Sequence, residues 1–452
     1  MDALPDLRPT LERYARQNLP RYTSYPTAPH FAPMEEAVYR AWLASVEPGD
    51  RLSLYLHIPF CRSLCWYCGC NTAVTRSVAR TSRYAEGLVT EATMLAAALP
   101  DDRPVEALHL GGGTPSAIGA TALDEVMTAL RQRFRFLPDA ELSVELDPRM
   151  LDDATVAVLA RKGFRRASLG VQDMSPEVQK LIGRIQSPEL VQAAVRKLRE
   201  AGIAAINFDL MYGLPGQTAA HVTESARFAA AMGADRVAVF GYAHVPWMKP
   251  HQKAIPEDLL PGAMDRMEQA DAAEAALLAA GYVAIGLDHF ARPGDPMALA
   301  AQSGVLKRNF QGYTTDRAPV LLGLGASAIG GLRQGYAQNL ADERAWLAAL
   351  KEGHLPIARG VALTEDDRLR RGIIEAVMCD LALDLRRVPL RIWRSAEARL
   401  EPLVADGLAA FEDGRLVATD AGRRFVRHIA AAFDAHLGAH LGSGSGRHSR
   451  AV

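Results

Sequence analysis

From residue 51 onward, short apolar runs alternate with longer stretches in which apolar residues recur at helical spacing. The helical stretches include 79–98, 188–201 and 218–232, and each ends near a glycine or a proline. The apolar runs predict six strands, at Leu52–Ile58, Ala107–Leu110, Leu142–Leu146, Ala167–Val171, Ala205–Met211 and Val237–Tyr242. Strand and helix in alternation favour parallel strands joined by right-handed crossovers. The pattern therefore predicts an α/β sheet, and periodicity leaves open whether it is a doubly wound sheet or a barrel.

Polar residues and glycines follow several of these predicted strands. Gly111-Gly-Gly-Thr-Pro115 comes after the second strand, and Glu145 and Asp147 come at the end of the third. Gln172 follows the fourth strand, and Asp209 lies on the fifth. Parallel strands bring their carboxyl ends to one edge, where each loop can contribute a group to a shared ligand. The series predicts a ligand site at that edge, although a triple glycine alone could be only a tight turn.

The first 45 residues begin with a short helical pattern and continue into Arg21-Tyr-Thr-Ser-Tyr-Pro-Thr-Ala-Pro29, where two prolines oppose regular structure. We interpret residues 1–45 as an N-terminal arm that covers the active site. The arm either packs two tyrosines on the main domain, which we favour on physical grounds, or lets Arg21 and Tyr22 reach a substrate.

The last part of the chain, 362–452, is predicted to be a mainly helical domain. Helices are expected at 365–382 and 389–406, followed by a hairpin with Asp413-Gly414 at its turn and a final helix. This order resembles a winged helix. Residues 361–452 carry 14 Lys and Arg against 13 Asp and Glu, so we expect a lid or packing domain and not a nucleic-acid binder. The tail from about 442 is expected to be disordered.

The overall composition is that of an average globular protein. Hydrophobic residues make up 49% and charged residues 23% of 452 residues, and the formal net charge is -1. Such a charge gives no electrostatic attraction to nucleic acid or to an anionic membrane. No apolar run approaches the ~20 residues of a membrane span, and the amino terminus is too polar for a signal peptide. We therefore expect a cytoplasmic protein.

Four of the five cysteines, Cys61, Cys65, Cys68 and Cys70, lie within ten residues. In a cytoplasmic chain such thiols are metal ligands more often than disulfides. Structural zinc usually takes paired ligands, and no second cysteine pair or His-x3-His follows here. Thiolates are also the usual ligands of iron–sulfur clusters, and three of them around four irons leave one iron open for a substrate. A zinc or purely structural site is the alternative.

The spacing Cys61-x3-Cys65-x2-Cys68, just after a strand and with Tyr67 before the last cysteine, resembles the radical S-adenosylmethionine (SAM) superfamily. The resemblance implies an incomplete six-stranded (β/α) barrel over residues 46–300. It also implies one 4Fe-4S cluster on Cys61, Cys65 and Cys68, whose free iron binds SAM. A fourth thiolate would close that iron, so we place Cys70 near the cluster and not on it.

Longer motifs extend the resemblance over nearly the whole chain. They are Arg21-Tyr-Thr-Ser-Tyr-Pro-Thr27, the cysteine run, Gly111-Gly-Gly-Thr-Pro115, Val144-Glu-Leu-Asp-Pro148, Gly170-Val-Gln-Asp173, Asp209-Leu-Met-Tyr-Gly-Leu-Pro-Gly216 and Arg308-Asn-Phe-Gln-Gly-Tyr-Thr314. Together they resemble the oxygen-independent coproporphyrinogen III oxidase family. That family would convert two propionates of coproporphyrinogen III to vinyl groups, giving protoporphyrinogen IX, by means of a 5'-deoxyadenosyl radical made from SAM.

The resemblance also implies two SAM molecules per chain. One would be bound to the cluster and contacted by Tyr55, Gly112, Glu145 and Ile329. The second would be held by Tyr67, Gly113, Thr114, Gln172, Arg184, Asp209 and Ala243, and residues 301–361 would contribute to the SAM site. The family commonly has Phe where this chain has Tyr67. The expected catalytic residues are Cys61, Cys65, Cys68, Cys70 and Tyr22.

The implied partners are coproporphyrinogen III, an electron-donor protein for the cluster and an unknown terminal electron acceptor, and the chain is expected to be a monomer. Two alternatives are a haem chaperone from the same superfamily and a haem-degrading radical SAM relative. The chaperone branch generally lacks a cysteine at the Cys70 position and lacks the arm from Arg21 to Thr27. This chain has both features.

Overall fold

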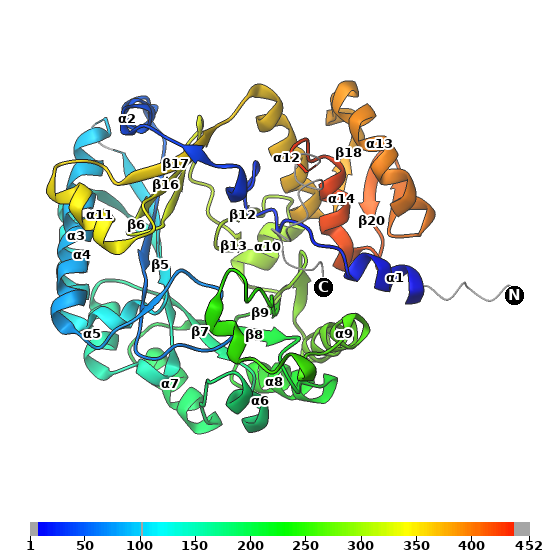
Figure 1. Ribbon diagram of the computed structural model, residues 1–452, viewed down its shortest axis with the longest axis horizontal. Coiled ribbons are helices and arrows are strands. Elements are labelled where there is room, and N and C mark those ends of the chain that lie inside the picture. Colours follow the sequence, from blue (N-terminus) through cyan, green and yellow to red (C-terminus); the bar gives the residue numbers. More distant parts are fainter. Residues whose placement is uncertain (1–7, 101–102, 438–452) are drawn as a thin grey trace, which may run out of the picture.

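The computed structural model describes residues 8–100 and 103–437. At its centre is a run of seven parallel strands that forms a curved sheet (Figure 1). In spatial order these strands are β14 (Val320–Leu324), β2 (Leu52–Ile58), β5 (Pro104–Gly112), β6 (Arg135–Leu146), β7 (Arg166–Gln172), β8 (Ala205–Tyr212) and β9 (Arg236–Gly241). All six predicted strands are confirmed, and β14 is a further parallel strand that the sequence did not reveal. It pairs with β2.

Antiparallel strands extend this run on both sides. Beyond β14 lie β15 (Ile329–Gly331), β16 (Gly335–Asn339), β17 (Ile357–Ala362) and β1 (Ala32–Pro33), and beyond β9 lie β11 (His289–Ala291) and β10 (Val283–Ile285). The two edge strands, β1 and β10, do not pair with each other. The sheet is therefore an incomplete barrel, as the resemblance implied.

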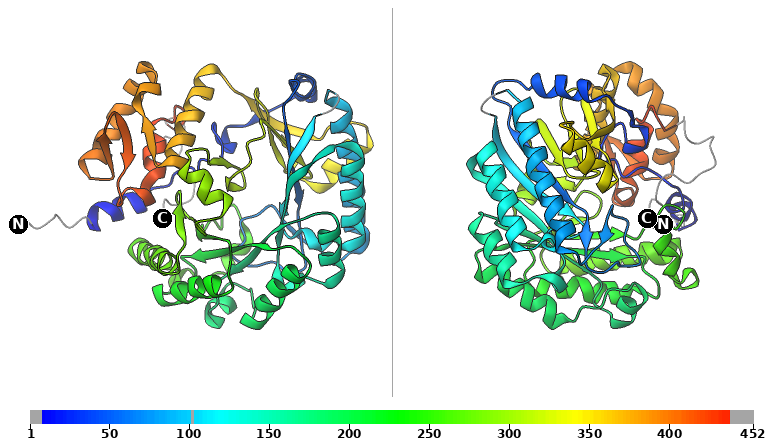
Figure 2. Two further views of the ribbon diagram at one scale, coloured as in Figure 1. Left: turned by 180° about the vertical axis from the view of Figure 1, so that it is seen from behind. Right: turned by 60° about the vertical axis from the view of Figure 1, so that its left-hand side comes forward.

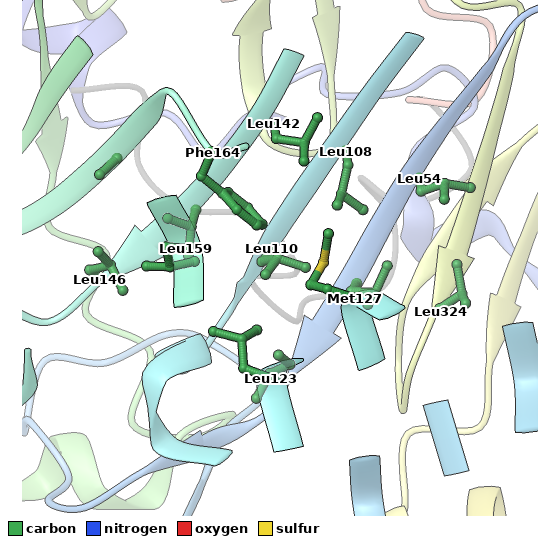
Figure 3. Packing of buried hydrophobic residues seen from close by; sticks show 14 of the residues in the cluster. Leu54, Leu108, Leu110, Leu123, Met127, Leu142, Leu146, Leu159, Phe164 and Leu324 are labelled. Atoms are coloured by element: carbon green, nitrogen blue, oxygen red, sulfur yellow. The ribbon is translucent and has the colours of Figure 1, made fainter. Parts of the chain in front are cut away.

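Helices cover the outer face of the curved sheet (Figure 2). They are α3 (Val78–Ala98), α4 (Ala120–Arg133), α5 (Asp153–Arg161), α6 (Pro176–Leu181), α7 (Pro188–Glu200), α8 (Ala219–Ala231) and α9 (Ala263–Ala279). Alternate residues of each strand face opposite sides of a sheet. On β5, Leu108 and Leu110 point outward and pack with Met127 of α4 (Figure 3), whereas His109 points into a central cavity. Burying such a leucine stabilises the fold by about 1.5–3 kcal/mol.

The C-terminal module follows the predicted order of elements. It contains α12 (Glu365–Asp380), α13 (Leu390–Ala405), α14 (Val426–Ala432) and a small sheet of β18 (Ala382–Asp384), β20 (Arg415–Ala418) and β19 (Ala409–Glu412). The predicted hairpin is confirmed as β19 and β20. The tail expected to be disordered lies outside the described residues.

The two tyrosines of the N-terminal arm pack mainly on this module and not on the main domain as we had expected, although the same apolar cluster includes Ala263 and Met267 of α9. Tyr22 and Tyr25 belong to the apolar core that the C-terminal helices form, and α1 (Arg8–Ala15) lies beside that module (Figure 1). The Tyr22 hydroxyl donates a hydrogen bond to Asp434. The amphipathic tyrosines find both apolar surface and polar acceptors there, which explains the difference. The arm then crosses to the barrel, where β1 pairs with β17 and α2 (Glu36–Ala44) follows.

The segment between barrel and module supplies β14 to β17, α10 (Pro296–Gln302), α11 (Glu343–Lys351) and a hairpin of β12 (Lys307–Asn309) and β13 (Gly312–Thr314). Short strands β3 (Phe60–Cys61) and β4 (Ala73–Val74) enclose the cysteine run. Among the described residues, none of the helices has the length and apolar character needed to cross a membrane.

Candidate active site

Four cysteines surround one cavity at the carboxyl ends of the parallel strands. This thiol cavity has a volume of about 180 Å³, and Cys61, Cys65, Cys68 and Cys70 line it. Thr72 donates a hydrogen bond to the Cys61 sulfur at 3.4 Å. Hydrogen bonds to sulfur are among the features by which a protein tunes an iron–sulfur cluster.

The donor set fits a cluster better than a single ion. Within the ranges that the structure describes, no three His, Cys, Asp or Glu side chains are arranged to hold one metal ion. The thiols instead ring a common space, as a cluster with one thiolate per iron requires. A hydrogen bond from Cys70 lowers the pKa of Cys68 to about 6, so Cys68 is predisposed to be a thiolate. Burial raises the pKa of Cys61 to about 11, and binding iron would displace that proton.

Three side chains from one segment fix the backbone of the cysteine loop. Lys249 donates to the carbonyl of Cys70 at 2.8 Å, and His251 donates to that of Cys68 at 2.7 Å. Gln252 donates to the carbonyl of Tyr67 at 2.9 Å. Sequence reasoning did not find this contact, because nothing in the spacing relates residues about 180 positions apart.

Asp147 connects two arginines beside Cys65. Its carboxylate lies 2.6 Å from Arg149 and 3.1 Å from Arg184. Both guanidinium groups also donate to the Cys65 sulfur, at 3.5 and 3.4 Å, and Arg184 donates to the carbonyl of Gly170 at 2.5 Å. Burial alone would raise the pKa of Asp147, but the two arginines hold it below its usual value. Arg149 was not among the predicted site residues, although it directly follows the Asp147-Pro148 turn.

The glycines after β5 allow the backbone to approach the cysteine loop closely. A Cβ atom at Gly113 would lie 2.5 Å from the carbonyl oxygen of Phe60. Gly112 has a φ of +119°, which strongly favours glycine, and its N–H donates to Glu145 at 3.2 Å. The Gly111-Gly-Gly turn is therefore required by close packing as well as by conformation.

Two acids connect the thiol cavity to the interior of the barrel. Glu145 and Asp209 line both the thiol cavity and a barrel cavity of about 420 Å³, which Tyr55 and His109 also line. His109 lies 3.0 Å from Glu145. This contact, together with the hydrogen bond from the Gly112 N–H, keeps the pKa of Glu145 below its usual value despite burial. Burial and the nearby charge of Glu145 raise the pKa of Asp209 to about 7. Near neutral pH, Glu145 is therefore ionised, whereas Asp209 exchanges between its protonated and ionised forms.

The structure brings most of the predicted site residues together. Tyr67, Gly112, Gly113, Gln172 and Arg184 line the thiol cavity with the four cysteines. Thr114 is buried and accepts a hydrogen bond from the N–H of Asp147, which lines the thiol cavity. The carbonyl of Ala243 accepts a hydrogen bond from Gln252. Ile329 begins β15, and Tyr22 lies apart, in the core of the C-terminal module.

Comparison with known proteins decides the family. Residues 55–229 match the model of the radical SAM superfamily, and residues 363–425 match that of the HemN C-terminal domain. The chain is 48% identical over 446 residues to the oxygen-independent coproporphyrinogen III oxidase of Bradyrhizobium diazoefficiens, covering 97% of this chain and 98% of the relative. The corresponding protein of Paracoccus denitrificans is 45% identical over 92% of this chain and 94% of its own length. This chain belongs to the oxygen-independent coproporphyrinogen III oxidase family.

A solved structure agrees with this assignment. Coproporphyrinogen III oxidase (HemN) from Escherichia coli, described as a radical SAM enzyme, superimposes with a TM-score of 0.88 at 38% identity, covering 93% of this chain and all of the other. Membership of the radical SAM oxidase family implies a 4Fe-4S cluster and SAM as cofactors. The haem chaperone and the haem-degrading relative are not favoured.

Proposed function

We propose that this chain is an oxidoreductase that converts two propionates of coproporphyrinogen III to vinyl groups without oxygen, giving protoporphyrinogen IX. The observation that carries the proposal is a thiol-lined cavity that shares Glu145 and Asp209 with the barrel cavity, in a chain that matches the oxidase family over nearly its full length. Radical generation and substrate binding would then share one enclosed space.

The cofactors supply the step that side chains cannot perform. A propionate β C–H is unactivated, so no side-chain base of ordinary pKa removes its proton. When bound, the cluster and SAM supply a radical that abstracts that hydrogen atom. Cys61, Cys65 and Cys68 would hold the cluster, while Cys70, which hydrogen-bonds to Cys68, would lie near the cluster and not on it. The barrel walls would keep water away from the radical.

We further propose that two SAM molecules bind side by side. Tyr55, Gly112, Glu145 and Ile329 would contact the cluster-bound molecule, whose amino and ribose hydroxyl groups could donate hydrogen bonds to the ionised Glu145. Tyr67, Gly113, Thr114, Gln172, Arg184, Asp209 and Ala243 would hold the second. Support comes from the thiol cavity, which Glu145, Gln172 and Arg184 line together.

The proposal also includes a substrate-binding role for Tyr22 and a monomeric protein. An electron-donor protein would reduce the cluster, and a separate acceptor would take the electron that the substrate loses. The decisive experiment is anaerobic incubation of the reconstituted protein with coproporphyrinogen III, SAM and a reductant. Protoporphyrinogen IX and 5'-deoxyadenosine should form together. If the protein binds haem but consumes no coproporphyrinogen III, the proposal is wrong.

A further inference from the structure

Five arginines line a small cavity at the carboxyl ends of β8 and β9. We call it the arginine cavity, and its charged residues are Arg21, Arg266, Asp288, Arg308, Arg424 and Arg427. Its volume of about 50 Å³ has room for a few water molecules or one carboxylate group, and not for a ring. Tyr212 and Gly241 line it from the barrel side.

The arginines of this cavity differ in what they contact. Arg424 forms ion pairs with Asp271 and Glu274. Arg21 donates to the carbonyl of Gly241 at 3.1 Å, and Arg308 donates to the carbonyl of Arg21 at 3.2 Å. Neither Arg21 nor Arg308 forms an ion pair within the described parts of the chain. Nη1 of Arg308 is buried and has no hydrogen-bond partner there.

Asp288 provides the sole carboxylate of the cavity lining among the described residues. This carboxylate already has a partner, because Nδ1 of His289 lies 2.7 Å from it. Burial would raise the pKa of Asp288, but His289, Arg308 and Arg21 together lower it to about 2. The cavity therefore keeps an excess of positive charge, and a bound anion would be stabilised there.

The residues that line the arginine cavity come from several parts of the chain that surround the barrel mouth. Arg21 comes from the arm, Arg308 from β12 and Arg427 from the C-terminal module. Arg308 also lines a larger cavity of about 330 Å³ beside the arm, and Asn309 and Asp316 line both that cavity and the barrel cavity. A ring held at the barrel mouth can thus extend a side chain to Arg308 while another faces the SAM site.

We propose that the arginine cavity binds a propionate carboxylate of the porphyrinogen substrate, one that the reaction does not remove. This inference rests on the proposed function. Coproporphyrinogen III carries four propionates and loses two, so a site for a retained carboxylate holds the ring through both turnovers. Because its arginines come from arm, barrel and module, the carboxylate also ties these parts together over the active site. Guanidinium forks suit carboxylates, which explains arginine here in place of lysine.

The test measures binding separately from turnover. Coproporphyrin III, the air-stable oxidised form of the ring with the same four carboxylates, is titrated by fluorescence into the reconstituted full chain. Arg308→Gln and Arg21→Gln should each weaken its binding by about 10- to 100-fold, the loss of one hydrogen bond between charged groups. Arg308→Lys should restore part of the loss. Arg387→Gln is the matched control, because Arg387 is an exposed arginine of the C-terminal module.

Binding of labelled SAM, measured by equilibrium dialysis, separates the two sources of a carboxylate. If the Gln variants lose bound SAM but bind coproporphyrin III normally, the cavity serves the carboxylate of SAM and the inference is wrong. It is also wrong if both Gln variants bind the porphyrin as the wild type does. Weaker binding by Arg21→Gln cannot be attributed to misfolding, since Arg21 is exposed on the surface. A wild-type protein that neither binds the porphyrin nor converts coproporphyrinogen III would instead refute the proposed function itself.

Discussion

The thiol cavity and the arginine cavity lie at the same end of the barrel but balance their charges differently. Beside the thiol cavity, Arg149 and Arg184 share the carboxylate of Asp147 and donate to the Cys65 sulfur. In the arginine cavity, Arg21 and Arg308 donate to backbone carbonyls and form no ion pair within the described chain. Removing the anion from a buried ion pair destabilises the fold, because it leaves a buried charge unpaired. In the arginine cavity one carboxylate, Asp288, faces five arginines, and this excess of positive charge favours an anion that arrives with a ligand.

The largest effect should come from removing a thiolate from the thiol cavity. Replacing Cys61, Cys65 or Cys68 singly by Ser should abolish both the cluster and turnover, because one iron would then have no protein donor. Cys70→Ser is the matched control in the same loop and should retain the cluster, with impaired turnover. Iron and sulfide assays on the four anaerobically reconstituted variants measure this. A colourless Cys70→Ser protein would show that Cys70 is a ligand and that our assignment is wrong.

The second prediction tests whether the matched charges stabilise the fold. Asp147→Asn leaves the guanidinium groups of Arg149 and Arg184 without their carboxylate, which should lower the free energy of unfolding by about 3–5 kcal/mol. Urea unfolding of the cluster-free protein measures the change. Asp384→Asn is the control, since Asp384 forms a comparable pair with Arg386, whose side chain is 83% exposed. That variant should unfold as the wild type does. Equal stability of the two variants would mean that the Asp147 pairs contribute nothing.

Much of the barrel could be predicted because its strands carry their own signal. Leu52–Ile58 matches β2 at both ends, since every residue of that run is apolar or is followed by an apolar one. The helices between strands showed helical spacing and glycine stops. Strand β14 was missed because its five residues, with glycine among them, lack a period and become a strand only by pairing with β2.

The site was predictable where its residues adjoin a motif. The cysteine spacing pointed to Cys61, Cys65 and Cys68, and the strand ends pointed to Glu145 and Asp209. His109, Ser143 and Ser168 line the barrel cavity and alternate with buried apolar residues, so a period of two could have revealed them. The arginine cavity had no such signal. Its residues are separated by up to about 400 positions, and folding alone brings them together.

The third prediction asks whether Arg184 only stabilises the cysteine loop or also binds ligand. If its guanidinium also takes the carboxylate of the second SAM, Arg184→Ala should cost about 2–5 kcal/mol of binding at that site, and two bound SAM molecules should become one. The cluster-bound molecule should remain, because iron holds it. Equilibrium dialysis with labelled SAM gives the stoichiometry. Two molecules bound to the variant would restrict Arg184 to its pairing with Asp147 and Cys65.

The smallest effect concerns Asp209, whose pKa is raised to about 7 by burial and by the charge of Glu145. Its carboxyl loses a proton as the pH rises from 6 to 8, and the resulting negative charge attracts the positively charged SAM. Affinity at the second site should therefore increase with pH over this range, by about ten-fold at most. Asp209→Asn should bind SAM with the weak, flat affinity of the protonated acid. Glu145, whose pKa is lowered, stays ionised throughout, so Glu145→Gln should weaken binding of the cluster-bound SAM and, because its charge no longer raises the pKa of Asp209, should move the midpoint of this pH dependence to lower pH. Dialysis at pH 6, 7 and 8 distinguishes the two acids, and a slope that survives in Asp209→Asn would assign the titration to another group.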